Sequence, residues 1–500
     1  MSMTISAPPD YMPSTAERRG GSLGLNHRLR LLVWLLVSWM LLGGAGCVPL
    51  TDRPEQPFEL PATFSQQGGE VSHGNWWLVF DDPQLDSLIS IALLENFSLR
   101  SFEARLDQAR AVARRAGAEL MPSLTSVASM VRSRSESATG DSTSRDYGLE
   151  LFASYQIDLW GRIRASRDAA LSDVVASSYD LSAAALTLSA QVVDTWYQLL
   201  EQRGQQTLLS EQLAASNQVL DLVNQKFEVG QVGAADLLQQ RQVVEAALGE
   251  MALVKAKSAV LEHQLAVLTG LSPGLGKSSL SGSLPKLPLL PATGLPAELL
   301  HNRPDVLSLW HRLQAADHRL AVAVAERLPT IGLTARLQSS AEHGSQLFDD
   351  WLASVAANLA GPLLDGGRRR AEADRARAVV TELLNQYAQA VLVAVGEVED
   401  ALAREEQQRH YLTSLDRQVE SSQIALQSIR DRYLQGVENY QRVLTALTSH
   451  QSLQRRYLTA QRELIGYRVD LYLALGGTCN HELRVTPEQS SSFSLDAHHE

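Results

Sequence analysis

The sequence is poor in cysteine, aromatic residues, glycine and proline, and it has no excess of positive charge. Two cysteines among 500 residues cannot form a disulfide framework or a cysteine-based zinc site. Glycine and proline number 32 and 18, below their usual share, which argues against a low-complexity chain and favours long helices. The net charge of −12 disfavours a nucleic-acid-binding protein, which needs a basic face. A charged content of 20% is typical of a folded chain.

The N-terminus has the three parts of a secretory signal. Basic residues precede the apolar run Leu31–Leu42, and small residues follow it. Because Cys47 comes directly after these small residues, the segment resembles a bacterial lipoprotein signal, whose cysteine is lipid-modified after cleavage. We therefore predict a signal peptide over 1–46 and lipidation at Cys47. Gly44 departs from the pattern, because such signals usually carry leucine there.

A plain transmembrane anchor is the alternative interpretation of this apolar segment. Glycines and Pro49 disfavour it, because they spoil the second half of such a helix. Lipoproteins retained at the inner membrane usually carry an aspartate directly after the lipidated cysteine. Val48 occupies that position here, so the segment resembles that of a lipoprotein sorted to the outer membrane. Residues 47–75 are rich in proline and are predicted to form a lipid-anchored tether. The tail 477–500, which contains Cys479, is expected to be disordered.

The chain contains an internal duplication. A shift of 206 residues aligns 161–270 with 367–476 without a gap. Three glycine pairs coincide: Gly161 with Gly367, Gly230 with Gly436, and Gly270 with Gly476. Because the period far exceeds 50 residues, this is a two-unit duplication and not a solenoid. Residues 271–296 are predicted to link the two halves.

Each half has the same predicted order of elements: one helix, two strands and two long helices that meet at a glycine. Apolar residues at steps of three and four predict the helices. The first helices are expected at 85–119 and 297–326, and the long ones at 163–228, 234–268, 369–434 and 440–475. A helix of 66 residues is about 100 Å long, which favours a coiled coil or a helical barrel.

The strand segments alternate apolar and polar residues with a period of two. The predicted strands are about 121–133 and 146–160 in unit 76–160, and about 329–339 and 350–363 in unit 297–366. Odd positions are apolar in the last three, whereas the first alternates poorly. Runs of this length suit transmembrane β-strands, and a half-buried soluble hairpin is the alternative. The polar linkers 133–145 and 338–350 are expected to be exposed loops.

Four strands cannot close a membrane barrel, whose smallest form has eight. An open edge in lipid would leave backbone groups unpaired at several kcal/mol each. If these strands span a membrane, the chain must therefore oligomerise: two chains would supply eight strands and three would supply twelve.

Five motifs, in this order on this duplication, resemble the TolC-like outer-membrane factor family, and within it the lipoprotein branch of tripartite (RND-type) efflux systems. They are the segments 76–85, 157–162, 302–306, 362–368 and 432–436. The resemblance implies a mainly α fold with a membrane β-barrel portion. It implies a homotrimer whose twelve-stranded β-barrel in the outer membrane is continued by a twelve-helix periplasmic α-barrel.

The function implied by this resemblance is a passive export duct, with no reaction and no cofactor. An inner-membrane pump and a periplasmic adaptor would feed it, and no nucleic acid is involved. The alternative is an N-terminally anchored periplasmic coiled coil. It does not account for the paired strands, which have the same apolar alternation in both halves. An enzyme on a helical scaffold is the third interpretation, and the sequence lacks a convergent set of histidines, cysteines and carboxylates for it. The cargo stays open among drugs, metals, solvents and polypeptides.

Two kinds of turn contain the candidate functional residues. Asp158 and Asp365 precede long helices, where a carboxylate can accept backbone N–H groups, and Gly161 and Gly367 allow the change of direction. Gly230 and Gly436 end long helices, as a left-handed cap requires. The resemblance implies that these later turns form a periplasmic tip that meets the adaptor. The tip residues would be Phe227, Val229, Gly230, Tyr433, Gly436 and Val437.

The resemblance also implies a gate at the tip. In the family, a tyrosine and an aspartate hold the tip closed, and Tyr433 and Asp236 occupy the matching positions. The chain departs at Glu438 and Arg442, where the family can carry a basic residue and an acidic ring. An Asp236–Arg442 link is one interpretation of this departure, because opposite charges close together in a narrow tunnel attract. Two solvated helix charges are the alternative.

No metal site is predicted. His311 and His318, with Asp317, lie at helical spacing, but solvated helix residues are the expected interpretation.

Overall fold

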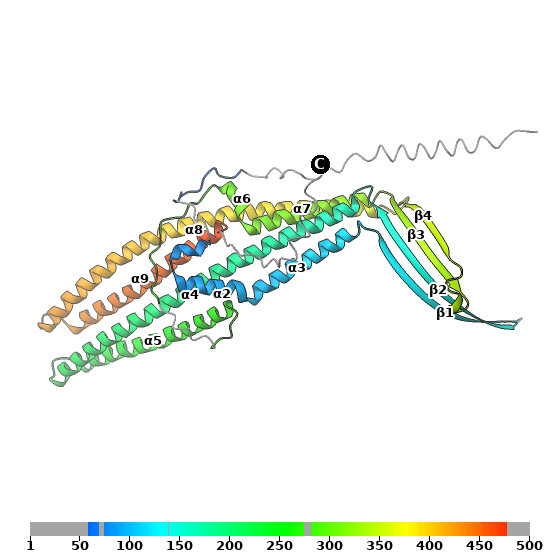
Figure 1. The fold of residues 1–500 in the computed structure, drawn as a ribbon. Coiled ribbons are helices and arrows are strands. Elements are labelled where there is room, and N and C mark those ends of the chain that lie inside the picture. The colour runs from blue at the N-terminus through cyan, green and yellow to red at the C-terminus, as the bar shows by residue number, and fades with distance from the viewer. Residues whose placement is uncertain (1–58, 70–74, 139, 275–281, 478–500) are drawn as a thin grey trace, which may run out of the picture. The chain divides into compact units, whose positions relative to one another are not determined.

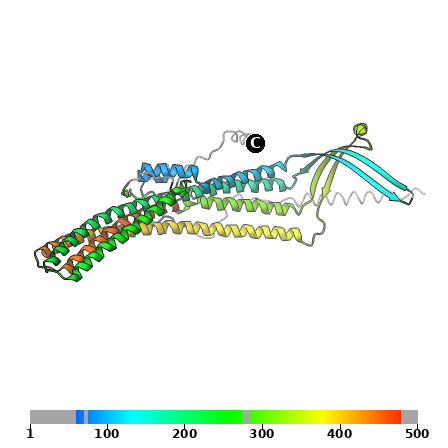
Figure 2. The same cartoon turned by 90° about the horizontal axis from the view of Figure 1, so that it is seen from below.

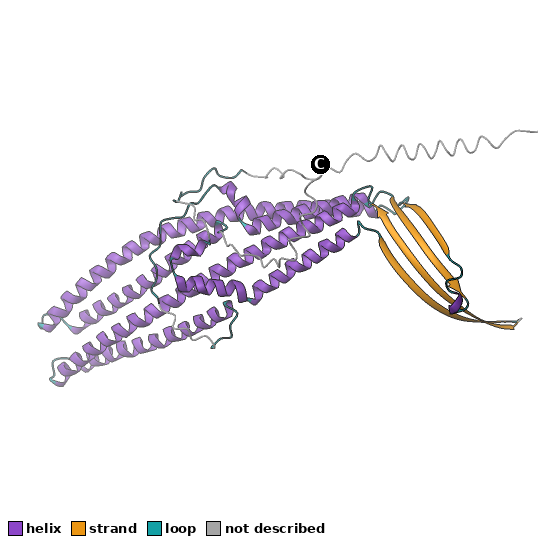
Figure 3. Cartoon of the chain, in the orientation of Figure 1, coloured by secondary structure: helices purple, strands orange, loops and turns teal. Residues whose placement is uncertain are grey.

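A computed structural model describes residues 59–69, 75–138, 140–274 and 282–477 (Figure 1). The predicted signal peptide 1–46, Cys47 and Cys479 lie outside these residues, as do most of the tether and nearly all of the tail. The described part is mainly helical and contains one antiparallel sheet (Figure 3).

The sheet contains four strands in the order β1-β2-β3-β4. Their bounds are β1 (Ser123–Ser137), β2 (Gly140–Ile157), β3 (Thr330–Ala341) and β4 (Leu352–Ala360). Neighbouring strands are antiparallel throughout. In the described chain β1 and β4 each pair on one side only, so the sheet has two open edges.

The register places most of the apolar residues of the four strands on one face. Leu151 of β2 pairs with Leu337 of β3, which pairs with Ala353 of β4. Directly paired residues in antiparallel strands point to the same face. On the other side, Leu151 pairs with Ser126, so β1 presents its even positions to this face. The alternation of β1 is poor because Ser126 lies on the apolar face, whereas Val127 and Val131 lie on the other face and pair with Glu150 and Asp146.

The prediction that 133–145 forms a loop is wrong. The β1–β2 ladder continues to Ser137 paired with Gly140, so nearly all of this segment is strand. Polar side chains stabilise the extension: Arg134 forms an ion pair with Asp141 at 2.6 Å. The segment is polar on both faces, and a period-two pattern cannot detect such a strand. The linker 338–350 also begins in strand, because β3 continues to Ala341, and it contains the short helix η3 (Gly344–Gln346).

The four long helices are α4 (Arg162–Glu228), α5 (Ala234–Leu268), α8 (Arg368–Leu434) and α9 (Tyr440–Ala474). Their limits lie within one residue of the expected ones. Both α4 and α8 have 67 residues, and both α5 and α9 have 35. Each element of the first pair begins 206 residues before its counterpart, which is the shift found in the sequence.

The helix expected at 85–119 is two helices, α2 (Pro83–Glu95) and α3 (Phe97–Ala118), preceded by η1 (Trp76–Phe80). Asn96 breaks them with an extended backbone, and its side chain accepts the Leu99 N–H at 3.1 Å. The helix expected at 297–326 is likewise divided into η2 (Pro296–Glu298), α6 (Leu299–Asn302) and α7 (Pro304–Ala325). Arg303 is extended because the following proline disfavours a helical backbone there.

Helix α4 packs against α3, α5, α7 and α9, and α8 packs against α7 and α9. Figure 2 shows the pair α4–α5 alongside the pair α8–α9. One core joins η1 and α2 to α4, α5 and α9, with Trp76 and Trp196 fully buried in it. A second core joins Phe64 and α6 to α8 and α9. Each strand pair is therefore followed by a long helix that short elements hold at its middle: η1 and α2 pack against α4, and α6 packs against α8. We call these short elements the belt.

Candidate functional site

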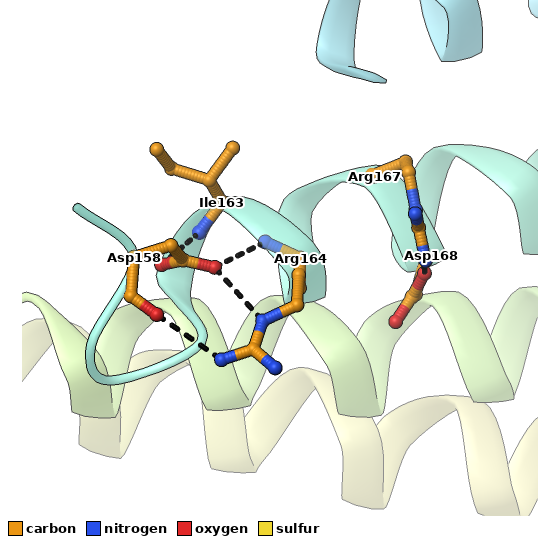
Figure 4. A network of polar contacts seen from close by, with 5 residues as sticks. All are labelled: Asp158, Ile163, Arg164, Arg167 and Asp168. Carbon is orange, nitrogen blue, oxygen red and sulfur yellow. Dashed lines mark hydrogen bonds and ion pairs between the residues drawn. The ribbon is translucent and has the colours of Figure 1, made fainter. Parts of the chain in front are cut away.

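The first strand-to-helix junction is organised by Asp158 (Figure 4). Its carboxylate accepts the backbone N–H groups of Ile163 and Arg164, both at 2.9 Å, and the Arg164 Nε–H at 3.2 Å. Burial opposes ionisation, but these hydrogen bonds and the Arg164 charge outweigh it, so the pKa of Asp158 is lowered. Gly161, with φ of 72°, starts α4 in a left-handed conformation. The carboxylate thus caps the helix at its positive end.

The second junction repeats this arrangement with different spacing. Asp365 accepts the N–H of Gly367 at 3.0 Å and that of Arg369 at 3.3 Å. Gly366 and Gly367 both have positive φ, at 65° and 84°. Both predicted aspartates therefore hold the start of a long helix, which is a structural role.

Replacing Asp158 by alanine should destabilise the chain at neutral pH by about 1–2 kcal/mol, because the start of α4 loses its cap. Since the folded pKa is lowered, this contribution is complete above the ordinary value of 3.8 and is lost as the pH falls through the folded pKa. Thermal melting of wild type and variant in detergent should therefore differ at pH 7 and converge at strongly acid pH. Asp168→Ala, which removes only an ion pair with Arg167, is the control and should change little at either pH.

The two tip turns have the same hydrogen-bond pattern. Gly230 donates to the Phe227 carbonyl at 2.9 Å, and Gln231 donates to the Lys226 carbonyl at 2.8 Å. Gly436 and Val437 repeat these bonds at 3.0 and 2.9 Å. Both glycines have positive φ, at 71° and 75°. This is the Schellman arrangement, in which glycine satisfies the last carbonyls of a helix.

The predicted tip residues differ in exposure. Val229 and Val437 are 68% and 62% exposed, and Phe227 is 39% exposed. Beneath them lies a small core whose members come from all four long helices. Its buried residues are Val223, Leu237, Tyr433, Tyr440 and Val443. The turns therefore present apolar side chains on a rigid base.

Tyr433 is buried in this core, at 5% exposure, and its hydroxyl has no hydrogen-bond partner among the described residues. Lys226 Nζ lies 4.0 Å from the centre of its ring. Burial, with a further contribution from the Asp236 charge, raises the pKa of Tyr433. The Asp236 carboxylate itself accepts the Gly233 N–H at 3.3 Å. The structure thus brings Tyr433 and Asp236 near each other without a hydrogen bond between them.

Within the described residues of the single chain, Arg442 does not pair with Asp236. Arg442 Nη1 instead binds Glu438, at 2.9 Å. Glu438 lies in the turn before α9, next to the N-cap Asn439, whose side chain accepts the Arg442 N–H at 3.1 Å. Glu438, whose side chain is only 11% exposed, also lies 3.4 Å from Arg432. Arg442 therefore pairs with a carboxylate of the preceding turn and not with Asp236 on α5.

Sequence reasoning missed a buried polar contact above the tip. Tyr440 donates to Gln240 Oε1 at 2.5 Å, and Gln240 Nε2 donates to the Ser216 carbonyl at 2.6 Å. Gln240 is fully buried, and the contact joins α9, α5 and α4. A glutamine on the apolar stripe of α5 was the only signal for it.

It also missed a pair of contacts at the two helix breaks. Asn96 donates to the Leu268 carbonyl, at 3.0 Å, and Arg303 donates to the Ala474 carbonyl, at 3.2 Å. Each bond joins a break between short helices to the last residue of a returning long helix. Shifting Leu268 by 206 residues gives Ala474, so the duplication could have revealed that the two sites correspond.

Of the two histidines at helical spacing, His311 makes an aromatic contact. His311 stacks on Tyr179 with ring centres 5.5 Å apart. Within the described residues there is no group of three or more histidines, cysteines or carboxylates arranged to hold a metal.

The family model for outer membrane efflux proteins matches residues 88–271 and 295–477. The chain therefore belongs to the outer membrane efflux protein family, and it is an outer-membrane efflux channel and not an enzyme. This confirms the resemblance to TolC-like channels and the prediction of an outer-membrane location.

Among its relatives is the pyoverdine export outer membrane protein OpmQ of Pseudomonas putida, 33% identical over 90% of this chain and 97% of that protein. The toluene efflux pump outer membrane protein TtgI of Pseudomonas putida is 30% identical over 88% of this chain and 97% of that protein. The solved outer-membrane channel OprN is 28% identical, with a TM-score of 0.80 over 86% of this chain and 99% of that one. The duplicated helical fold with one sheet is thus the fold of a known channel.

Proposed function

We propose that the chain is a passive export duct that works as a homotrimer, with a twelve-stranded β-barrel continued by a twelve-helix α-barrel. The observation that carries the proposal is the open four-stranded sheet with one apolar face. Both of its edges would leave backbone groups unpaired in lipid, so only closure by further copies makes it stable there. Three copies supply twelve strands, and membership of the family favours three over two.

The exposure of α8 supports closure by a neighbouring copy. An 18-residue window of this helix has a mean hydropathy of 1.3 but is only 22% buried in the single chain. By length and composition such a helix could cross a membrane, but α8 has 67 residues and packs against α7 and α9. Helices of the next copy would cover the apolar window and complete the tunnel wall.

Extraction from outer membranes tests this assembly. A duct should purify in detergent as a stable trimer and conduct ions in a planar bilayer. The alternative, a periplasmic coiled-coil structural or adaptor protein, predicts a water-soluble rod without conductance. A monomeric rod would overturn the proposal.

Lipid anchoring is the second part of the proposal. Cys47, in its signal-like context, would attach the chain to the inner face of the outer membrane, with a large periplasmic portion below. A labelled fatty acid should be incorporated by the wild type and not by Cys47→Ser. Equal labelling of the two chains would exclude lipidation at this cysteine.

The tip would meet the periplasmic adaptor, which connects the duct to the inner-membrane pump. The exposed Val229 and Val437 on two equivalent turns support this, because apolar side chains held at a rigid surface favour protein contact. Purification of the channel with its bound adaptor and pump would identify both partners.

We also propose that Tyr433, Asp236 and Arg442 contribute to a gate at this tip. The buried Tyr433 hydroxyl without a partner supports the proposal, because such a group has a reason to bind a neighbouring copy or a second state. Arg442 would act through Glu438, whose carboxylate it holds.

Asp236→Ala combined with Tyr433→Phe should raise single-channel conductance, because the closed tip loses polar groups that stabilise it. The measurement is planar-bilayer recording of the reconstituted channel. Tyr411→Phe, at a 45% exposed position of α8, is the control and should leave conductance unchanged. A double variant with wild-type conductance would rule out this gate.

Cargo choice would lie with the pump. Relatives of similar identity are named for pyoverdine and for toluene, which differ widely in size and polarity. That similar channels are named for such different compounds favours selection before the cargo enters the duct.

A further inference from the structure

The two strand-to-helix junctions differ in length. Four residues separate Ile157, the end of β2, from the start of α4, whereas seven separate Ala360, the end of β4, from the start of α8. The entries into β1 and β3 are equal, with four residues after α3 and four after α7. Strand β4 therefore ends three residues early in an otherwise symmetric duplication.

Those three residues have a definite counterpart in the first half. Counted from the start of the following helix, 361–363 correspond to 155–157 of β2. In β2 these last three residues pair only with β3, on the side away from β1. The corresponding neighbour of β4 is absent from a single chain. The early end of β4 is thus explained by a missing strand.

The side chains at this place are unusually exposed. Leu363 is 99% exposed, and Leu124, near the start of the opposite edge strand β1, is 73% exposed. Their counterparts Ile157 and Ile331 pair directly with each other inside the chain, and Ile157 is 36% exposed. Figure 1 shows β1 and β4 at the two borders of the sheet. Leu363 and Leu124 therefore occupy positions equivalent to those of Ile157 and Ile331, which pair directly between the two halves.

We propose that Leu363 of one copy pairs directly with Leu124 of the next copy, so that 361–363 extend β4 along the neighbour's β1. This rests on the proposed trimeric duct and fixes the register of its seams. Counting from the helix ends, Ile157 corresponds to Leu363 and Ile331 corresponds to Leu124. The intermolecular ladder is then a repeat of the β2–β3 ladder.

Face parity supports this register independently. The apolar face takes odd positions of β4, such as Leu359, and even positions of β1, such as Leu124. Pairing Leu363 with Leu124 places both leucines on the apolar face. A slip of one residue would turn every side chain of β1 against the wrong face of β4. Pro362, next to Leu363 in the proposed extension, has no backbone N–H to donate. It is acceptable there because it lies at the end of the strand.

Disulfide trapping tests the register. In a Cys479→Ser background, Leu124→Cys with Leu363→Cys should form covalent dimers and trimers in membranes on mild oxidation. Directly paired residues have Cα atoms about 4.5–5.5 Å apart, within the range for a disulfide. Within one chain the two positions are separated by three strand spacings, which alone are about 14 Å, so the bands report contact between copies. The background chain alone controls for Cys47.

The matched control is Leu124→Cys with Leu364→Cys, because Leu364 is 97% exposed but belongs to the other face. Its cross-linking should be about tenfold weaker, since the Cβ vectors diverge. A second pair, Met130→Cys with Ala357→Cys, tests the same register inside the strands, with Ala356→Cys as its control. If one variant folds poorly, the other pair still tests the register.

The mass of the unmodified protein in detergent separates the two possible failures. A trimer in which the control pairs cross-link as well as the proposed ones would overturn the register and leave the duct intact. A monomer without cross-links would overturn the trimer and the register together.

Discussion

Replacing Arg468 by alanine is expected to destabilise the folded chain by about 3–5 kcal/mol, because it leaves a buried carboxylate without its main partner. Arg468 and Glu405 have side-chain exposures of 0% and 1%. Arg468 Nε and Nη2 bind the two carboxylate oxygens at 2.9 and 2.6 Å. The same guanidinium donates to the carbonyls of Pro288 and Leu289, at 3.3 and 3.0 Å. One arginine therefore joins α8, α9 and the segment that links the two halves.

Thermal melting in detergent measures the loss, and limited proteolysis locates it. Cleavage near Leu289 should increase in Arg468→Ala, because the linker loses two hydrogen bonds. Arg404→Ala removes an exposed ion pair with Asp400 and should cost less than about 1 kcal/mol. Arg468→Met with Glu405→Leu should recover much of the loss, because no charge is left buried. If Arg468→Ala melts like Arg404→Ala, the buried pair has no such role.

The large elements of this fold could be predicted because their signals repeat. Over α4 and α8 the apolar residues step by three and four for many turns, and Gly230 and Gly436 mark the ends. The strand parity is clear in three strands because most directly paired residues on one face are apolar. A shift of 206 residues predicted that the halves share their architecture, and the two sets of helices have equal lengths.

The breaks and extensions could not be predicted, because single residues or cross-strand partners decide them. Asn96 interrupts a continuous helical pattern by capping α3 with its own side chain. In the polar segment 133–145, residues 133–137 and 140–145 become strand only because they pair across the hairpin. Neither cause alters the periodicity of the hydrophobic residues.

The candidate site also contains features that could be predicted from the sequence and contacts that could not. The left-handed glycines follow from local backbone geometry, and the structure contains them where they were expected. The pair that Arg442 forms with Glu438, a carboxylate four residues away, was not predicted. Contacts such as Tyr440–Gln240 and Arg468–Glu405 join residues 200 and 63 positions apart, and only the packed helices bring them together.

Gly270→Ala should destabilise the chain far more than Gly230→Ala, although both glycines end a long helix in the same conformation. Their φ angles are 75° and 71°, so each alanine meets a backbone penalty of about 1–2 kcal/mol. A Cβ at Gly230 would meet nothing within 4 Å, whereas one at Gly270 would lie 2.5 Å from the Glu95 carbonyl oxygen. Relieving that overlap must move the end of α5 away from the α2–α3 break.

That movement also breaks the hydrogen bond from Asn96 to the Leu268 carbonyl, at the point where the belt holds α5. Overpacking of this kind adds about 1–3 kcal/mol, so the total for Gly270→Ala is expected to be about 2–5 kcal/mol. The second half repeats the comparison: Gly476 would bring a Cβ to 2.8 Å from the Asn302 carbonyl oxygen, and Gly436 has open space. Melting of the four variants in detergent should therefore give two large and two small shifts. Four equal shifts would mean that these caps matter only through their backbone conformation and that the belt does not hold the returning helices.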